Sequence, residues 1–293
     1  MGDTLESLQR RKQSAGELGS VVRTMKAMAA SNINQYEMAV SSLQDYYRTV
    51  SLGIHACVNN KKISVASLNE TNKNKRSTVA VIFGSDQGLV GRFNEVLITF
   101  ARQILKEMPG QKDIWAVGER IYSRLQDAGH LSTQFFNVPN SVSSITSLVN
   151  SILIKSEECR EKNQQYSLYI FHNTPSNDEG YHQEVQKLFP PDEKWKEDIV
   201  KIQWPSKKLP EVIGGTKSTF GALIREYLFV SIYKACAESL AAENASRLEA
   251  MERAEKNIDE MLDDLKHGYN RLRQSTIDEE LFDVVAGFEA LKG

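Results

Sequence analysis

Hydrophobic positions near the start of the chain recur at alternating spacings of three and four residues. This is the heptad pattern of a coiled-coil helix. Asn32 is the clear polar exception in an otherwise mostly apolar seam. The predicted seam residues of this segment include Leu18, Val22, Met25 and Ala29. We therefore predict an N-terminal coiled-coil helix over residues 1–58.

The same alternation returns in the last third of the chain, where Lys234, Asn244 and Glu255 interrupt it. All seven prolines lie between Pro109 and Pro210, so neither end of the chain carries this helix-breaking residue. The predicted seam residues of this second segment include Leu248, Met251, Ile258, Leu262 and Leu265. We predict a C-terminal coiled-coil helix with a protruding tip over residues 215–293.

Between these ends, short strand-like runs alternate with segments of helical period. The expected strands are STVAVIF, DIWAVG, STQFFNV, YSLYIFHN and DIVKIQW. Such alternation is typical of βαβ units around a mainly parallel sheet. The predicted fold class is therefore α/β. It combines a Rossmann-like α/β domain over residues 77–210 with two long terminal helices that fold back as an antiparallel coiled coil.

The predicted C-terminal helix is longer than its partner. If residue 57 lies beside residue 217, Leu5 lies near Tyr269, and the rest of the helix has no helix of its own chain beside it. An apolar stripe nevertheless continues past that point, through Ile277, Leu281, Val284, Val285 and Phe288. We expect another protein to cover this stripe, or the helix to fray.

Three polar residues precede the stripe: Arg271, Arg273 and Gln274. One interpretation is an ordinary solvated helix face. The other is a set of side chains that grip the carboxylates or a loop of a partner, because the planar guanidinium group of arginine forms bidentate bonds.

Composition narrows the classes of function. The formal net charge of −2 provides no basic field for nucleic acid. No apolar run approaches the length that crosses a bilayer, and the first residues lack the apolar core of a signal peptide. The three cysteines, which lack CxxC spacing, are expected to be buried thiols: Cys57, Cys159 and Cys236.

Catalytic and metal-binding patterns are also missing from the sequence. None of the five histidines stands at metal-ligand spacing from another ligand, so packing or surface roles are expected for His55, His130, His172, His182 and His267. There is no GxSxG, HExxH or Cys-His grouping. We therefore expect no catalytic residues, no metal site and no cofactor.

The stretch GSDQGLVGRFN follows an expected strand and precedes an expected helix, a context in which phosphate-binding loops occur. It matches neither GxGxxG nor GxxxxGK[ST], and the carboxylate of Asp86 would repel phosphate. We interpret it as a structural turn or docking loop, with nucleotide binding as the alternative. The candidate docking residues are Asp86, Gly88, Gly91 and Asn94.

Four motifs together resemble one family. They are MKAMAASNINQYE, DQGLVGRFN, ENASRLEAMERAEKN (residues 243–257) and YNRLRQSTIDEELFDVVAG (residues 269–287). The chain resembles the gamma subunit of F-type ATP synthases, the central rotor stalk. It departs from the family pattern at Val90, where cysteine is usual, at Asn32, where lysine is usual, and at Asp278, where threonine is frequent. These departures suggest a divergent or alternative bacterial branch.

The resemblance implies a rotor shaft that couples ion flow through a membrane c-ring to ATP synthesis or hydrolysis in a hexamer of alpha and beta subunits. The stripe at the tip would lie in an upper bearing, and Arg273 and Gln274, with Arg271 nearby, would meet a loop of a beta subunit. The α/β domain would contact the epsilon subunit and the c-ring.

The resemblance also implies a location and excludes some partners. The chain would be a non-catalytic, peripheral subunit on the cytoplasmic face of a bacterial membrane, with no nucleic acid and no direct lipid insertion. The alternatives are a nucleotide-binding α/β enzyme that oligomerises through its helices and a coiled-coil scaffold without a motor.

Overall fold

The computed structural model describes residues 4–59, 77–129, 132–162, 166–176, 180–208, 210–213 and 215–290. Their contacts divide the chain into two compact units. The terminal unit comprises Met1–Ala29 and Arg247–Gly293, and the sheet unit comprises Ala30–Ser246. His130 lies outside the described residues. The predicted three-part division at residues 1–58, 77–210 and 215–293 stays a prediction.

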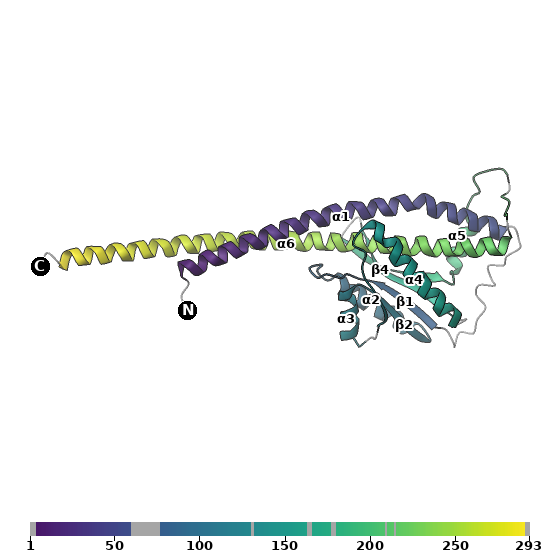
Figure 1. Cartoon of the computed structure of the whole chain (residues 1–293), viewed down its shortest axis with the longest axis horizontal. Coiled ribbons are helices and arrows are strands. Elements are labelled where there is room, and N and C mark those ends of the chain that lie inside the picture. The colour runs from purple at the N-terminus through teal and green to yellow at the C-terminus, as the bar shows by residue number, and fades with distance from the viewer. Residues whose placement is uncertain are drawn as a thin grey trace. The chain divides into compact units, whose positions relative to one another are not determined.

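The described residues form six helices and five strands, many of which are labelled in Figure 1. The helices are α1 (Leu5–Asn59), α2 (Phe93–Glu107), α3 (Glu119–Asp127), α4 (Val142–Lys162), α5 (Glu193–Lys201) and α6 (Thr216–Ala290). The strands are β1 (Ser77–Phe83), β2 (Gln111–Val117), β3 (Ser132–Phe136), β4 (Tyr166–Pro175) and β5 (Tyr181–Phe189). Helices α1 and α6 contribute residues to both units.

The five strands of the sheet unit form one sheet in the order β3-β2-β1-β4-β5. All neighbouring strands are parallel except β4 and β5, which pair antiparallel. The predicted α/β class with a mainly parallel sheet is confirmed. The central strand β1 is buried at every position, which explains its continuous apolar run, since both faces of a parallel sheet are covered.

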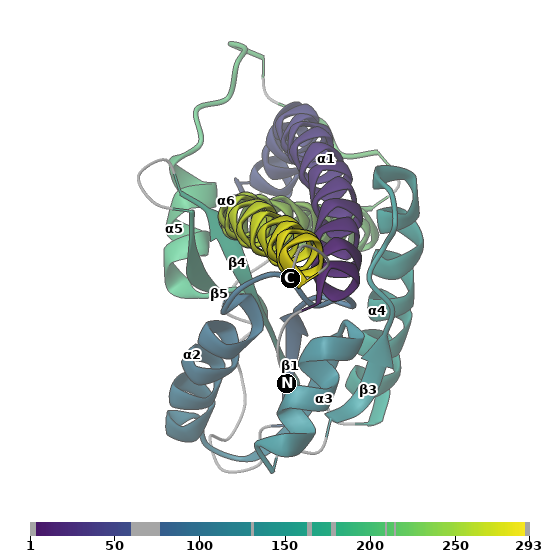
Figure 2. The same cartoon turned by 90° about the vertical axis from the view of Figure 1, so that its left-hand side faces the viewer.

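Alternate residues of β1 face two different helix layers, as the strand period of two requires. Val79, Val81 and Phe83 belong to a core cluster with α4 and α6. Ala80 and Ile82 belong to a second cluster with α2 and α3. The layers can be followed in the end-on view of Figure 2. Thus part of α6 serves as one of the helices that cover the sheet.

The strand expected at DIVKIQW is wrong, because its first residues end helix α5. The carboxylate of Asp192 caps this helix by accepting a hydrogen bond from the backbone N–H of Trp195 at 2.8 Å. Ile199 is buried, but its neighbour Val200 is 55% exposed. The β-branched residues that suggested a strand therefore occupy one buried and one solvent-facing position of a short amphipathic helix.

The fifth strand, β5, was not expected from the sequence. Its segment YHQEVQKLF is mostly polar, and Leu188 is its one fully buried position. It pairs only with β4 and forms an edge of the sheet. Edge strands need no continuous apolar run, so hydrophobic periodicity gives little sign of them.

Helices α1 and α6 are antiparallel within each unit. In the terminal unit, Lys26 pairs with Glu255, and Gly19 lies against Ile258. In the sheet unit, the hydroxyl of Tyr46 donates to Glu226 at 2.6 Å, and Gly53 lies against Leu223. Residue numbers rise along α1 as they fall along α6, so the predicted antiparallel helix pair is confirmed.

Candidate functional site on the terminal helices

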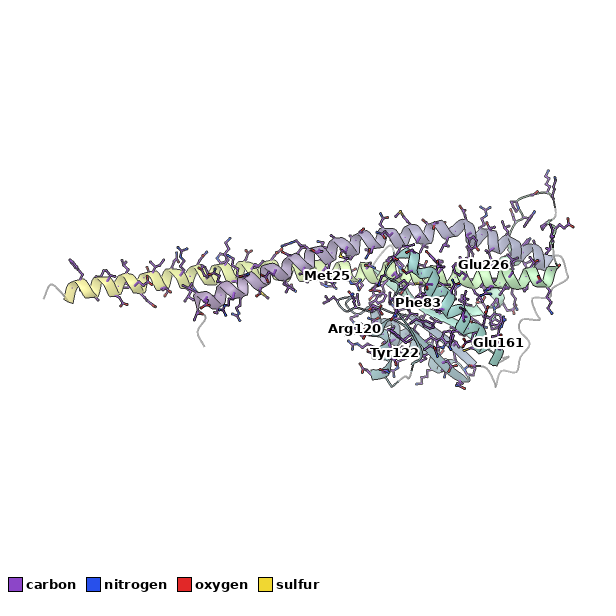
Figure 3. The ribbon with its side chains drawn as sticks, viewed as in Figure 1. Met25, Phe83, Arg120, Tyr122, Glu161 and Glu226 are labelled. Atoms are coloured by element: carbon purple, nitrogen blue, oxygen red, sulfur yellow. The ribbon has the colours of Figure 1, made fainter. Side chains whose placement is uncertain are left out.

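The buried seam of the terminal unit is built from residues that the heptad pattern selects. Val22, Met251 and Ile258 are each at most 6% exposed and form one cluster. Met25, labelled in Figure 3, and Leu262 are partly buried against it. The remaining predicted seam residues of this unit are a buried Ala29, half-buried Leu248 and Leu265, and a Leu18 that is 54% exposed.

Polar residues that interrupt the seam have partners. In the terminal unit, the ammonium group of Lys26 donates to Glu255 at 3.1 Å, and this hydrogen bond raises the pKa of Lys26. In the sheet unit, the amide nitrogen of Asn32 donates to the amide oxygen of Asn244 at 3.3 Å. Polar pairs at seam positions disfavour shifted registers of two helices, because a shift would leave them facing apolar residues.

The contact between α1 and α6 in the terminal unit ends near the start of α1. A groove of about 710 Å³ lies between the helices there. Leu8 and Ala15 line it from α1, and Leu265 and Gly268 line it from α6. Helix α6 continues beyond this groove to Ala290. The predicted mismatch in helix length is therefore present within this unit.

The apolar stripe at the end of α6 is exposed. It lies on the last turns of α6, whose side chains are drawn as sticks in Figure 3. Their exposed fractions are Ile277 50%, Leu281 60%, Val284 69%, Val285 48% and Phe288 60%. The stripe therefore forms an exposed apolar surface in this structure, and its cover by another protein stays a prediction.

Arg271, Arg273 and Gln274 lie on α6 immediately before the stripe, and all three are exposed. Guanidinium and amide groups in this position are free to form bidentate bonds with carboxylates or backbone groups of another chain. The contact with a partner loop stays a prediction for these residues.

The loop after β1 is held in place by its own polar residues. The carboxylate of Asp86 accepts hydrogen bonds from the backbone N–H groups of Glu119, at 2.9 Å, and Val138, at 3.1 Å. The side chain of Asn94 accepts from the N–H of Ser85 and donates to its hydroxyl. Asp86 thus occupies the N-terminus of α3, where a phosphate group would otherwise be stabilised.

The same loop is attached to α6 within the sheet unit. Val90 is buried with Phe93 against Ala242, and the hydroxyl of Ser246 donates to the carbonyl oxygen of Val90 at 2.7 Å. Leu89, in contrast, is 62% exposed and has a positive φ of 61°. The loop therefore presents the apolar side chain of Leu89 to solvent, while Val90 attaches the loop to α6.

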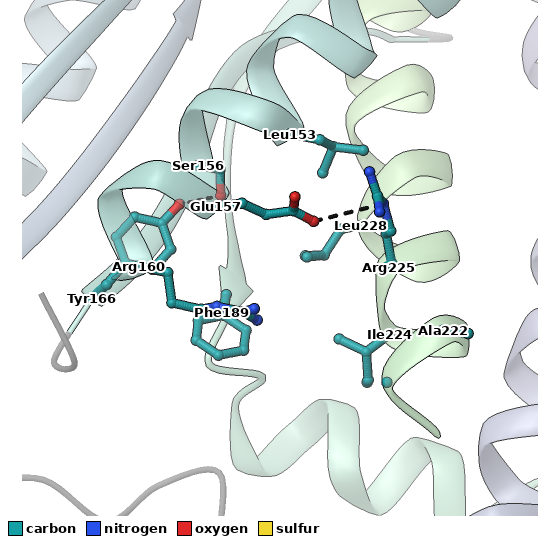
Figure 4. Close-up of a pocket in the computed structure, with 11 residues that line it drawn as sticks. Leu153, Ser156, Glu157, Arg160, Tyr166, Phe189, Ala222, Ile224, Arg225 and Leu228 are labelled. Atoms are coloured by element: carbon teal, nitrogen blue, oxygen red, sulfur yellow. Dashed lines mark hydrogen bonds and ion pairs between the residues drawn. The ribbon is translucent and has the colours of Figure 1, made fainter. Parts of the chain in front are cut away.

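A separate cavity of about 410 Å³ lies between α4, β4, the end of β5 and α6 (Figure 4). Arg225 and Glu157 form an ion pair across it at 3.6 Å. Tyr166 shares a hydrogen bond of 2.6 Å with Ser156, and burial raises the pKa of Tyr166. No residue of the loop after β1 lines this cavity, so it does not extend that loop into a nucleotide pocket.

Within the described part of the chain, no helix is both long enough and apolar enough to span a bilayer.

Comparison with known proteins agrees with this architecture. The family model described as ATP synthase matches residues 4–291. The ATP synthase gamma chain of Geobacter metallireducens is 25% identical over 299 residues, and that of Geotalea daltonii is 26% identical over 301 residues. Each alignment covers 99% of both chains.

Solved structures share the fold at lower identity. A chain of the Euglena gracilis mitochondrial ATP synthase, in an assembly described as OSCP/F1/c-ring, matches with a TM-score of 0.68 and 14% identity. The match covers 98% of this chain and 94% of that one. A chain from the central stalk and c-ring of the Tetrahymena thermophila enzyme matches with a TM-score of 0.56 and 19% identity over 80% of this chain.

The paired terminal helices, the sheet domain between them and the full-length match define a central-stalk subunit of a rotary, F-type ATP synthase. The chain belongs to the ATP synthase gamma chain family. It is a non-catalytic rotor subunit, as the resemblance of its sequence motifs indicated.

Proposed function

We propose that this chain is the shaft that couples ion flow through a membrane c-ring to ATP synthesis or hydrolysis in a hexamer of alpha and beta subunits. One observation carries the proposal. An apolar stripe of α6, half or more exposed at most of its positions, continues past the end of the seam that α1 covers. A surface of this kind is typical of a site that another protein covers.

The proposed enclosure is an apolar bearing formed by the alpha and beta subunits around Ile277, Leu281, Val284, Val285 and Phe288. Burying an aliphatic or aromatic side chain of this size contributes about 1.5–3 kcal/mol. A sleeve that removes the stripe from water therefore holds the tip strongly, but without directional bonds. Apolar contacts of this kind permit rotation, because no hydrogen bond has to break at each step.

The proposed mechanism is a shift of conformational populations. A shaft built from two unequal helices presents different side chains to each of the three surrounding catalytic subunits. Each catalytic subunit then favours the conformation with the better contact, and rotation exchanges these preferences. Arg271, Arg273 and Gln274 would supply the polar part of this contact to a loop of a beta subunit, while nucleotide and magnesium would be bound by the partner subunits.

The loop with Asp86, Gly88, Gly91 and Asn94 is the proposed docking element toward the epsilon subunit and the c-ring. The exposed Leu89 and the internal hydrogen bonds of Asp86 and Asn94 support this role, since the loop is already ordered by its own chain. Pre-ordering lowers the entropy cost of docking. The proposed location is the cytoplasmic face of a bacterial membrane, as a peripheral subunit, and the bacterial origin of the similar gamma chains supports it.

The double substitution Arg273→Ala with Gln274→Ala tests the polar contact. Both side chains are exposed, so we expect the melting temperature of the isolated chain to stay unchanged. In the assembled complex, the loss of hydrogen bonds to charged groups costs about 1.5–3 kcal/mol each. We expect ATP turnover or its coupling to ion transport to fall at least about tenfold.

Arg253→Ala is the matched control, because Arg253 is an exposed arginine of the same helix that pairs with Glu249. We expect this variant to retain turnover and coupling. Unchanged turnover and coupling in the double variant would remove Arg273 and Gln274 from the proposed contact. Purification of the chain with partners that lack ATPase subunits would contradict the shaft function itself.

A further inference from the structure

Three side chains of metal-ligating types, from two paired strands and one helix, converge in the sheet unit. They are His172 of β4, Glu184 of β5 and Glu238 of α6. One ligand atom from each lies within 4.8 Å of the other two. We propose that these three residues bind a divalent transition-metal ion, with Zn²⁺ as the best match. The site is separate from the helix tip and from the loop after β1.

The separations between the ligand atoms suit a tetrahedral ion. Nε2 of His172 lies 3.1 Å from an oxygen of Glu238 and 4.0 Å from an oxygen of Glu184. Zn²⁺ bound at about 2.1 Å from each ligand requires ligand atoms about 3.4 Å apart in a tetrahedron. The ligand atoms therefore need only small side-chain movements to surround one ion.

A fourth oxygen completes the arrangement. The hydroxyl of Thr174 lies 3.1 Å from Nε2 of His172 and 3.0 Å from the carboxylate of Glu184. A neutral alcohol is a weak ligand for Zn²⁺, so this hydroxyl or a water molecule that it orients takes the fourth position. One histidine nitrogen and two carboxylate oxygens form a mixed set that zinc accepts.

Burial and charge favour an ion over a simple ion pair. The side chain of His172 is only 2% exposed, and its Nε2 faces oxygens of Glu238, Glu184 and Thr174. A single proton on Nε2 serves only one of the surrounding oxygens at a time, whereas a divalent ion attracts all of them and neutralises both carboxylates. Lys234 pairs with the other oxygen of Glu238, at 3.6 Å, and adds a further positive charge beside the cluster.

An entry path reaches the cluster. A cavity of about 330 Å³ is lined by all three ligands, with Gln44 of α1 and Gln186 of β5 beside them. Glu184 is 46% exposed, so it links the buried histidine to solvent. A bound ion would tie the antiparallel edge of the sheet directly to α6. Its role is therefore structural, because it joins α6 to the sheet on which this part of the helix packs.

Ligand spacing does not predict this site, because His172, Glu184 and Glu238 match no metal-binding motif in the sequence. Only the pairing of β4 with β5 and the passage of α6 across the sheet bring them together. Spacing along the chain predicts no metal site, because it does not report side chains that converge only in the folded structure.

Metal titration of the full-length chain tests the proposal. We expect one Zn²⁺ per chain in competition with a colorimetric chelator at pH 7, and one Co²⁺ with the visible absorption of a tetrahedral site. Glu184→Gln is the primary variant, since its half-exposed side chain can change without disturbing the core. We expect it to weaken Zn²⁺ binding at least about tenfold and to abolish the rise in melting temperature that Zn²⁺ gives the native chain.

His182→Gln is the matched control, because His182 is an exposed histidine of the same strand as Glu184. We expect this variant to bind Zn²⁺ as the native chain does, and we expect His172→Gln to lose binding as Glu184→Gln does. The proposal is overturned if the native chain binds no stoichiometric Zn²⁺, or if the Glu184→Gln and His172→Gln variants bind it as tightly as the native chain. Either result would leave the cluster as a hydrogen-bonded histidine–carboxylate pair.

Discussion

Replacing Leu281 and Val284 together by aspartate should leave the isolated chain as stable as before and disrupt the assembled complex. In the isolated chain these side chains are 60% and 69% exposed, so a charge there remains solvated. In the proposed bearing, the change removes two buried aliphatic side chains and places two carboxylates in an apolar sleeve. The combined cost is at least about 3 kcal/mol, which weakens the contact roughly 100-fold.

The measurement compares the isolated variant chain with the same variant in the assembled complex. Thermal unfolding of the isolated chain reports its own stability, and ATP-driven ion transport by the assembled complex reports coupling. Met251→Asp is the matched control, because Met251 is 2% exposed in the seam of the terminal unit. We expect it to destabilise the isolated chain by at least about 3 kcal/mol. A tip variant that assembles and couples normally would argue against an apolar bearing.

Gly84→Ala should strongly destabilise the sheet unit. A Cβ at this position would overlap Cβ of Ile121 and would lie 2.8 Å from the side-chain oxygen of Asn94. Ile121 is fully buried, and Asn94 holds the loop after β1, so neither neighbour can move freely. We expect a loss of about 2–3 kcal/mol, seen as a fall in melting temperature of roughly 4–12 °C.

Gly88→Ala is the control for this prediction, because it lies in the same loop and the nearest atom to its added Cβ is a guanidinium nitrogen of Arg120 at 3.5 Å. We expect its effect on stability to stay within about 0.5 kcal/mol. Equal melting temperatures for Gly84→Ala and the native chain would show that the close approach between the loop and α3 is relaxed in solution.

The parts of the fold with strong periodicity could be predicted from the sequence. The buried Val22, Met251 and Ile258 are positions that the heptad pattern selects. The continuous apolar run of β1 follows from burial on both faces of the sheet. These signals are reliable because burial of an apolar face imposes a repeat along the chain.

Features without such a repeat could not be predicted. Strand β5 is a mostly polar edge strand, and α5 depends on the capping carboxylate of Asp192 as much as on apolar spacing. The cluster of His172, Glu184 and Glu238 arises from the order of the strands and from the path of α6. Tertiary convergence of this kind leaves no pattern in the sequence.

The candidate site also has a part that could be predicted from the sequence and a part that could not. The sequence predicted that the C-terminal helix is longer than its partner and that its unpaired tip is apolar, because both helix lengths follow from periodicity. It could not show that Asp86 occupies the N-terminus of α3, which argues against nucleotide binding at that loop. A coiled-coil scaffold without a motor is the other alternative, and the match of the family model to nearly the whole chain argues against it.

Thiol labelling at the tip tests the central claim most directly. The variant carries Val284→Cys and Cys159→Ser, and its other thiols, Cys57 and Cys236, are each 1% exposed. Burial also raises the pKa of Cys236 and makes its thiol unreactive. If the tip lies in a bearing, the new cysteine should react rapidly in the isolated chain and at least about tenfold more slowly in the assembled alpha, beta and gamma complex. Equal labelling rates in both states would mean that no partner encloses the tip and would contradict the shaft function proposed for this chain.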